Sequence, residues 1–144
     1  MRQKSLVRAA IAAAMLGWAG QASAQAQVTQ PRPGAAGTWR LIGHTQANFG
    51  ADHDAIIVKG PYDTFRRLKF KVTGAPLNMQ RMVVTYANGQ PDNIEVRQNI
   101  PEGGESRVID LQGSGARHIR RIEFWYDTKG ILKGKADVTV FGMK

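Results

Sequence analysis

The feature that most constrains the fold is a two-residue alternation of apolar and polar side chains, interrupted by turn residues. In residues 67–73 (RLKFKVT), apolar side chains share one face, and basic side chains with a final threonine share the other. Successive side chains of a β-strand point to opposite faces, so this pattern is typical of a strand with one buried face. Comparable runs occupy residues 38–43, 55–58, 77–86, 94–96, 108–111, 118–126 and 136–140. No segment beyond residue 24 shows helical periodicity, so the chain is predicted to be all-β.

About eight short strands separated by Gly, Pro, Asn and Asp residues are typical of a two-layer all-β fold. We expect an antiparallel, jelly-roll-like β-sandwich, with a small β-barrel as the alternative. The alternation slips by one residue near 80–81 and again near 120–121, and a β-bulge at each place would return the apolar side chains to the core. Asn88-Gly89 predicts a tight turn between two strands.

Residues 1–24 have the pattern of a secretory signal peptide. Three basic residues precede an uncharged, mostly apolar run at 9–20, and Ala22-Ser23-Ala24 supplies the small residues of a cleavage site. The run is shorter than the roughly 20 residues of a membrane-spanning helix, and no cysteine follows it to carry a lipid anchor. We therefore expect cleavage after Ala24, no transmembrane segment afterwards, and a protein that is exported to the periplasm or secreted.

The remaining chain divides into a leader and one domain. Residues 25–37 are rich in Gln, Pro, Ala and Gly, which predicts a flexible leader. Residues 38–144 are the predicted β-sandwich domain. Removal of residues 1–24 leaves 17 basic and 11 acidic residues, a formal charge of +6. Such a charge favours acidic partners over basic ones.

Residue types and spacings exclude several chemistries. The chain has no cysteine, which rules out disulfides, cysteine-ligated zinc, iron–sulfur clusters and a thiol nucleophile. It has no G-x-S-x-G elbow, no H-E-x-x-H pair and no glycine-rich phosphate loop. Glutamates 105 and 123 are expected to pair with arginines rather than to flank a glycosidic bond. We accordingly expect no catalytic residues.

One loop offers a possible metal site. Asp52 and Asp54 lie one residue apart, and their carboxylates with added carbonyl oxygens could bind calcium. The alternative is that both aspartates bond to their own backbone in a turn. No other cofactor is expected.

Basic residues that alternate with apolar ones indicate a charged surface. The predicted binding face comprises Arg67, Lys69 and Lys71 on one strand, and Arg120, Arg121 and the outward-facing Trp125 on another. Anionic glycans, lipopolysaccharide or lipid head groups are the expected ligands, because an exported protein seldom meets nucleic acid. The alternative is that these charges keep the protein dissolved and protect strand edges.

Beyond residue 38 the chain carries a series of short motifs. In chain order, they are Trp39 with Leu41 and Gly43, Asp52-His53-Asp54 with Ile56, Phe65 with Leu68, residues 72–76, 84–89 and 104–111, Arg117-His118-Ile119 with Ile122, Phe124 and Tyr126, Ala136-Asp137-Val138, and Gly142. This order of motifs resembles a family of small exported bacterial β-sandwich proteins of unknown function. The resemblance implies the sandwich fold and the exported location. It implies no catalytic residue.

Three functional hypotheses follow. The first is a non-enzymatic envelope module, binding or structural, whose basic surface suits anionic ligands. The second is an interaction domain for another envelope protein, acting through an edge strand or the leader. The third is a small metal-dependent hydrolase centred on Asp52, His53 and Asp54.

Overall fold

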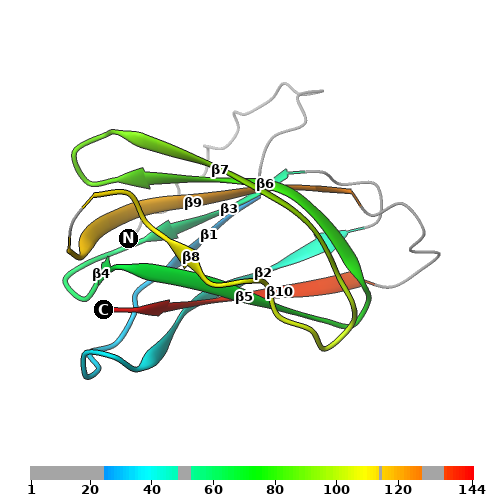
Figure 1. The fold of residues 1–144 in the computed structure, drawn as a ribbon, viewed down its shortest axis with the longest axis horizontal. Helices are drawn as coiled ribbons and strands as arrows, with labels where there is room; N and C mark the ends of the chain where they lie inside the picture. Colours follow the sequence, from blue (N-terminus) through cyan, green and yellow to red (C-terminus); the bar gives the residue numbers. More distant parts are fainter. Residues whose placement is uncertain (1–24, 49–52, 114, 128–134) are drawn as a thin grey trace, which may run out of the picture.

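The computed structural model describes residues 25–48, 53–113, 115–127 and 135–144, which form ten strands in two sheets (Figure 1). Sheet A has the order β1 (Gln25–Thr29), β3 (His53–Val58), β9 (Arg117–Asp127), β6 (Leu77–Tyr86) and β7 (Pro91–Ile100), and β4 (Thr64–Phe65) also pairs with β9. Sheet B has the order β2 (Trp39–Asn48), β10 (Lys135–Met143), β5 (Arg67–Thr73) and β8 (Ile109–Asp110). All pairs are antiparallel except β1–β3.

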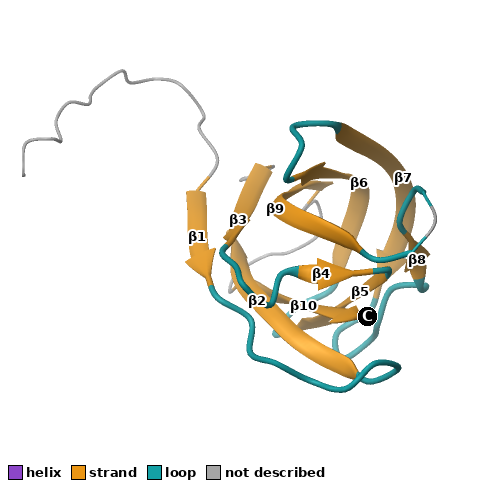
Figure 2. Ribbon diagram, turned by 90° about the vertical axis from the view of Figure 1, so that its left-hand side faces the viewer, coloured by secondary structure: helices purple, strands orange, loops and turns teal. Residues whose placement is uncertain are grey.

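The two sheets pack face to face and do not close into a barrel, so the sandwich prediction is confirmed (Figure 2). The inward side chains of β5 and β9 meet in the core, where the ring of Phe70 contacts that of Phe124 edge-on with 5.7 Å between centroids. Both rings are fully buried. The alternation predicted at residues 67–73 is present, with Leu68, Phe70 and Val72 buried. No helix among the described residues is long and apolar enough to span a membrane.

Both predicted bulges are present. The pairing of β6 with β7 and β9 shifts between Met79 and Arg81, and the pairing of β6 with β9 shifts again opposite Arg120. The second shift leaves Arg120 as the extra residue, so Ile119 and Ile122 both face the core. The β6–β7 connection is the expected tight turn, in which Gly89 adopts a φ of 90°.

The N-terminal segment departs from the prediction of a flexible leader. Residues 25–29 form β1, which adds to the edge of sheet A in parallel with β3. The Thr29 hydroxyl donates to the Ile42 carbonyl, and the Lys59 amide donates to the Thr29 carbonyl. The strand was missed because Gln27 and Val28 are exposed, Val28 by 63%, and so show no alternation of buried and exposed positions. Backbone hydrogen bonds rather than apolar periodicity hold β1 in place.

Two buried aspartates each accept a tyrosine hydroxyl inside the sandwich. Tyr126 donates to Asp54 at 2.8 Å, and Tyr86 donates to Asp92 at 2.7 Å. Burial raises the pKa of Asp54, although the Tyr126 hydroxyl, nearby His53 and Thr45 oppose this shift. Burial, together with the hydrogen bond to Asp92, raises the pKa of Tyr86 well above its usual range. These pairs satisfy polar groups that would otherwise be costly to bury.

Candidate binding surfaces

The predicted basic face is divided between opposite sides of the sandwich. Arg67, Lys69 and Lys71 project from the outer face of sheet B, because their neighbours on β5 fill the core. Arg121 and Trp125 project from the outer face of sheet A, because the side chains between them fill the core from the other side. The six predicted residues therefore do not form one patch.

Most of the predicted cations on the two faces have acidic partners. Arg67 pairs with Asp110 at 2.9 Å, and Lys69 pairs with Glu105 at 3.2 Å. On the other face, the guanidinium of Arg121 lies 3.5 Å from Glu123. Glu123 thus lies beside an arginine as expected, whereas Glu105 pairs with Lys69 instead of with an arginine. Their carboxylates reduce the attraction of both faces for an anion.

Trp125 lies in a stack on the outer face of sheet A. The His53 ring packs against the indole at 4.2 Å between centroids, nearly parallel to it. The Arg81 guanidinium lies 4.1 Å from the indole centroid. Cross-strand pairing places these three side chains in one row, because Trp125 on β9 lies opposite His53 on β3 and opposite Arg81 on β6. With His53 and Arg81 stacked on it, the indole presents its edge to a ligand more than its flat face.

A different surface carries unneutralised positive charge. Four arginines from separate parts of the sequence lie at the end of the sandwich that holds the C-terminus, and we call this surface the cationic end: Arg40, Arg66, Arg117 and Arg120. Figure 2 faces this end, with β4 and the C-terminus toward the viewer. The short strand β4 connects the two sheets at this end. It pairs with the start of β9 in sheet A, and the amide of the next residue, Arg66, donates to the Met143 carbonyl on β10 in sheet B.

Three of the four arginines of the cationic end donate from their side chains to main-chain carbonyls. Arg117 donates to the Gln112 carbonyl at 2.7 Å, Arg120 to the Ala87 carbonyl at 2.8 Å, and Arg40 to the Arg32 carbonyl at 3.0 Å. Within the described residues, none of the four arginines makes an ion pair with a carboxylate. A carbonyl orients a guanidinium without cancelling its charge.

The nearby acidic groups are already engaged. Asp63 lies 3.1 Å from His118, Asp110 holds Arg67, and Asp92 is buried against Tyr86. Aromatic rings support two of the arginines: Arg117 lies 3.9 Å from the Tyr86 centroid, and Arg40 lies 4.9 Å from that of Phe65. The guanidinium groups of Arg40, Arg117 and Arg120 are thus held in place by these contacts.

Shallow hollows border these side chains. One hollow of about 360 Å³ lies between Arg66, Arg67, Lys144 and the residues 36–37. Another of about 290 Å³ lies between Arg66 and the glycines 113 and 115. Both are open to solvent and could admit a phosphate, sulfate or carboxylate group. These two hollows are open depressions of the surface rather than an enclosed cleft.

The calcium hypothesis gains no support from the position of Asp54. This carboxylate is 2% exposed and faces the core, while Asp52 lies outside the described residues. In the part of the chain that the structure describes, no three His, Cys, Asp or Glu side chains are placed to hold a metal ion. Calcium binding at this loop stays a prediction.

Sequence reasoning located only part of the cationic end. Arg120 was among the predicted residues. Arg66 directly precedes the predicted Arg67, and Arg117 lies three residues before Arg120. Arg40 was missed because it lies in a strand far from the other three, and only the pairing of β2, β10 and β5 brings it near. No local sequence signal marks that proximity.

The fold defines the described part of the chain as an all-β sandwich domain of two sheets. The chain belongs to the family described as Domain of unknown function (DUF2541), which it matches over residues 9–142. The predicted resemblance to a family of unknown function is therefore confirmed. No curated protein matches the chain.

One similar solved structure is the subject of "Structural and functional characterization of Pseudomonas aeruginosa AlgX". The two chains share 13% identity with a TM-score of 0.46, and the match covers 72% of this chain. It covers 26% of the AlgX chain, so this protein spans about a quarter of that one. A likeness at this level carries no functional argument.

Proposed function

We propose that this protein is an exported, non-catalytic envelope module that binds anionic groups of a glycan or lipid through its cationic end. The observation that carries the proposal is a set of four arginines that lack acidic partners among the described residues. Three of them, Arg40, Arg117 and Arg120, are held by carbonyl oxygens, and Arg66 is exposed beside them. Such a surface attracts anions at long range and offers several N–H donors at contact.

The chemistry of arginine favours phosphate, sulfate and carboxylate ligands. A guanidinium presents planar donors that match two oxygens of such a group. Arg66 and Arg120 are exposed, and open hollows lie beside Arg66. Lipopolysaccharide, acidic polysaccharides and anionic lipid head groups all carry these anions in repeated arrays, so a surface with several arginines can engage more than one of them at once.

Export is the second part of the proposal. It rests on the basic, apolar and small-residue pattern of residues 1–24. The family match begins at residue 9 and so includes most of this segment. Cleavage after Ala24 would leave every described strand intact, because β1 begins at Gln25. Mass measurement of the protein recovered from the periplasm of an expressing bacterium tests the cleavage directly.

Binding measured at low and high salt tests the cationic end. The processed protein is titrated with lipopolysaccharide, with polygalacturonate, and with phosphatidylglycerol vesicles, using uncharged dextran and phosphatidylcholine vesicles as comparisons. We expect binding to at least one anionic probe that weakens steeply with added salt. Binding to polygalacturonate alone would identify a glycan as the source of the anion, whereas binding to phosphatidylglycerol alone would identify a lipid surface.

Charge-reversal variants locate the site. Arg66→Glu or Arg120→Glu should each lower affinity about tenfold, since an attractive group becomes a repulsive one. Arg107→Glu is the matched control: Arg107 is exposed and also bonds to a carbonyl, that of Glu95, but lies outside the cationic end. If Arg107→Glu weakens binding as much as Arg66→Glu does, net charge rather than this surface explains the interaction.

A further inference from the structure

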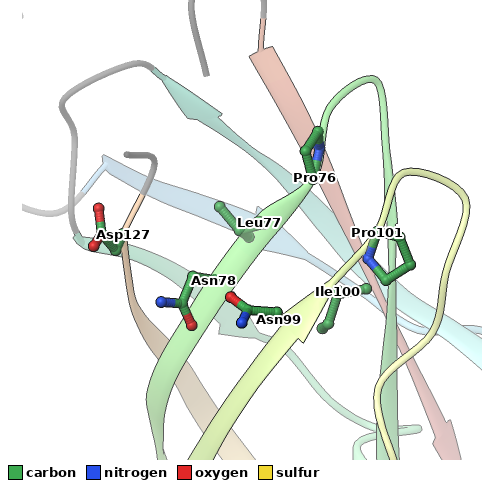
Figure 3. A pocket seen from close by; sticks show the side chains of 7 residues that line it. All are labelled: Pro76, Leu77, Asn78, Asn99, Ile100, Pro101 and Asp127. Carbon is green, nitrogen blue, oxygen red and sulfur yellow. The ribbon is translucent and has the colours of Figure 1, made fainter. Parts of the chain in front are cut away.

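A hollow with different chemistry lies at the other end of the sandwich. It measures about 340 Å³ and is lined by Pro76, Leu77, Asn78, Asn99, Ile100, Pro101 and Asp127 (Figure 3). Strand β9 runs from Arg117 at the cationic end to Asp127 at this hollow. Ten residue steps along an extended strand span about 33 Å, so the two surfaces are separate sites.

Strand register places three polar side chains of the hollow in one row. Asn78 on β6 is opposite Asn99 on β7 and opposite Asp127 on β9. Directly opposite residues on one face have Cβ atoms about 5 Å apart. Figure 3 shows Asn78 between the other two, with the two amides side by side. The row therefore presents two amides and a carboxylate across three adjacent strands, over about 10 Å.

The walls of the hollow are apolar and conformationally restricted. Pro76 precedes β6 and Pro101 follows β7, and the rings have fixed φ angles. The Pro101 carbonyl accepts the Gly104 amide, and the Gly103 amide donates to Val72 on the other sheet. Because these walls are already held, binding a ligand costs little ordering of the protein.

The row of His53, Trp125 and Arg81 on the outer face of sheet A adjoins the hollow. Trp125 lies two residues before Asp127 on the same face of β9, and Arg81 is opposite Trp125. Two residues along a strand correspond to about 7 Å. The indole edge and the Arg81 guanidinium thus lie one row beyond the amides, where a second unit of a chain-like ligand would pass.

We propose that this hollow and the adjoining Trp125 row bind a neutral saccharide. Amide side chains both donate and accept hydrogen bonds, as sugar hydroxyls do. A carboxylate accepts from two neighbouring hydroxyls, and proline rings contact the apolar C–H face of a sugar. Among the described residues, no Lys or Arg lines the hollow, so the hollow offers an acidic sugar no ion-pair partner. This inference goes beyond the proposed function, because both the site and the ligand charge differ.

Saturation-transfer NMR and calorimetry with defined oligosaccharides test the inference. The processed protein is measured with cellotetraose, chitotetraose and mannotetraose, and with tetragalacturonate as the acidic counterpart, at low and high salt. We expect binding of at least one neutral tetrasaccharide that is unchanged by salt and exceeds binding of tetragalacturonate. Salt independence separates this site from the cationic end.

Matched variants place the ligand. Asn78→Ala and Asn99→Ala should each weaken binding about tenfold or more, whereas Gln46→Ala should not. Gln46 carries the same amide on the outer face of sheet B, where it bonds to Asp137. Thermal unfolding confirms that each variant is folded. Arg66→Glu should leave neutral-sugar binding intact, so this inference and the proposed function can fail independently.

Three results would overturn the inference. The first is absence of measurable binding by any neutral tetrasaccharide at millimolar concentration. The second is equal binding by folded Asn78→Ala, Asn99→Ala and wild-type proteins. The third is binding that salt abolishes or that Arg66→Glu removes, since the ligand would then occupy the cationic end.

Discussion

Replacing Asp54 with asparagine is predicted to stabilise the protein at neutral pH. The Asp54 carboxylate is 2% exposed, and burial raises its pKa above the usual 3.8. The folded state therefore holds this proton at a pH where the unfolded state has released it. Stability falls as pH rises from 3.8 through the folded pKa, and the loss is complete above that pKa. Asparagine has no proton to release and avoids this loss.

The structure suggests the size of the effect. In the Asp54→Asn variant, the new side chain would keep an oxygen that accepts the Tyr126 hydroxyl, now bonded to Asp54 at 2.8 Å. Its amide could donate to the Thr45 hydroxyl, which faces Asp54 but has no partner of good geometry among the described residues. Removing the charge while keeping the contacts should add about 1–2 kcal/mol at pH 7. For a domain of this size, that gain raises Tm by about 4–8 °C.

Calorimetric unfolding between pH 3 and pH 7 measures the difference between Asp54→Asn and wild type. The Tm of the variant should exceed that of wild type at pH 7. The two Tm values should converge near pH 3, where Asp54 is protonated. Asp110→Asn, an exposed aspartate paired with Arg67, is the control and should not gain at pH 7. A lower Tm for Asp54→Asn at pH 7, or a difference that is constant with pH, would refute the reasoning.

Three further predictions concern packing and register. Gly142→Ala should destabilise the fold by about 1–3 kcal/mol, because an added Cβ would lie 2.5 Å from the Phe65 ring and 2.7 Å from Ile42; thermal unfolding against Thr139→Ala checks it, and an unchanged Tm would contradict it. Tyr86→Phe should cost about 1–3 kcal/mol by leaving buried Asp92 short of a donor, and urea unfolding that matches wild type would count against this. Deleting Arg120 should lower Tm far more than Arg120→Ala, because loss of the bulge turns Ile119 outward; equal Tm values for the two variants would show that the bulge does not set the register.

The strands were predictable wherever one face is buried. Leu68, Phe70 and Val72 mark β5, and the spacing of Ile119, Ile122 and Phe124 marks both β9 and its bulge. Two strands gave no such signal and were missed. β1 is held by backbone pairing with β3, and β4 is only two residues long, so its buried Phe65 makes no alternating pattern.

The candidate sites were less predictable than the fold. Trp125 was correctly placed facing outward, but its stacking with His53 and Arg81 depends on which strands flank β9. Arg67 and Lys69 were placed on an outward face, yet their acidic partners come from later segments of the chain. Strand order decides which charges are paired, and strand order is a long-range property that local patterns do not contain.

The most direct test of the central claim is to map the anion-binding site residue by residue. Backbone amide NMR spectra of the processed protein are recorded during titration with lipopolysaccharide-derived phosphorylated core oligosaccharide and with polygalacturonate. Binding at the cationic end predicts shifts clustered at residues 64–66, 86–89 and 112–120, weakening at high salt. Shifts confined to the outer strand faces around Lys71 or Arg121, or no shifts with either anion, would contradict the account.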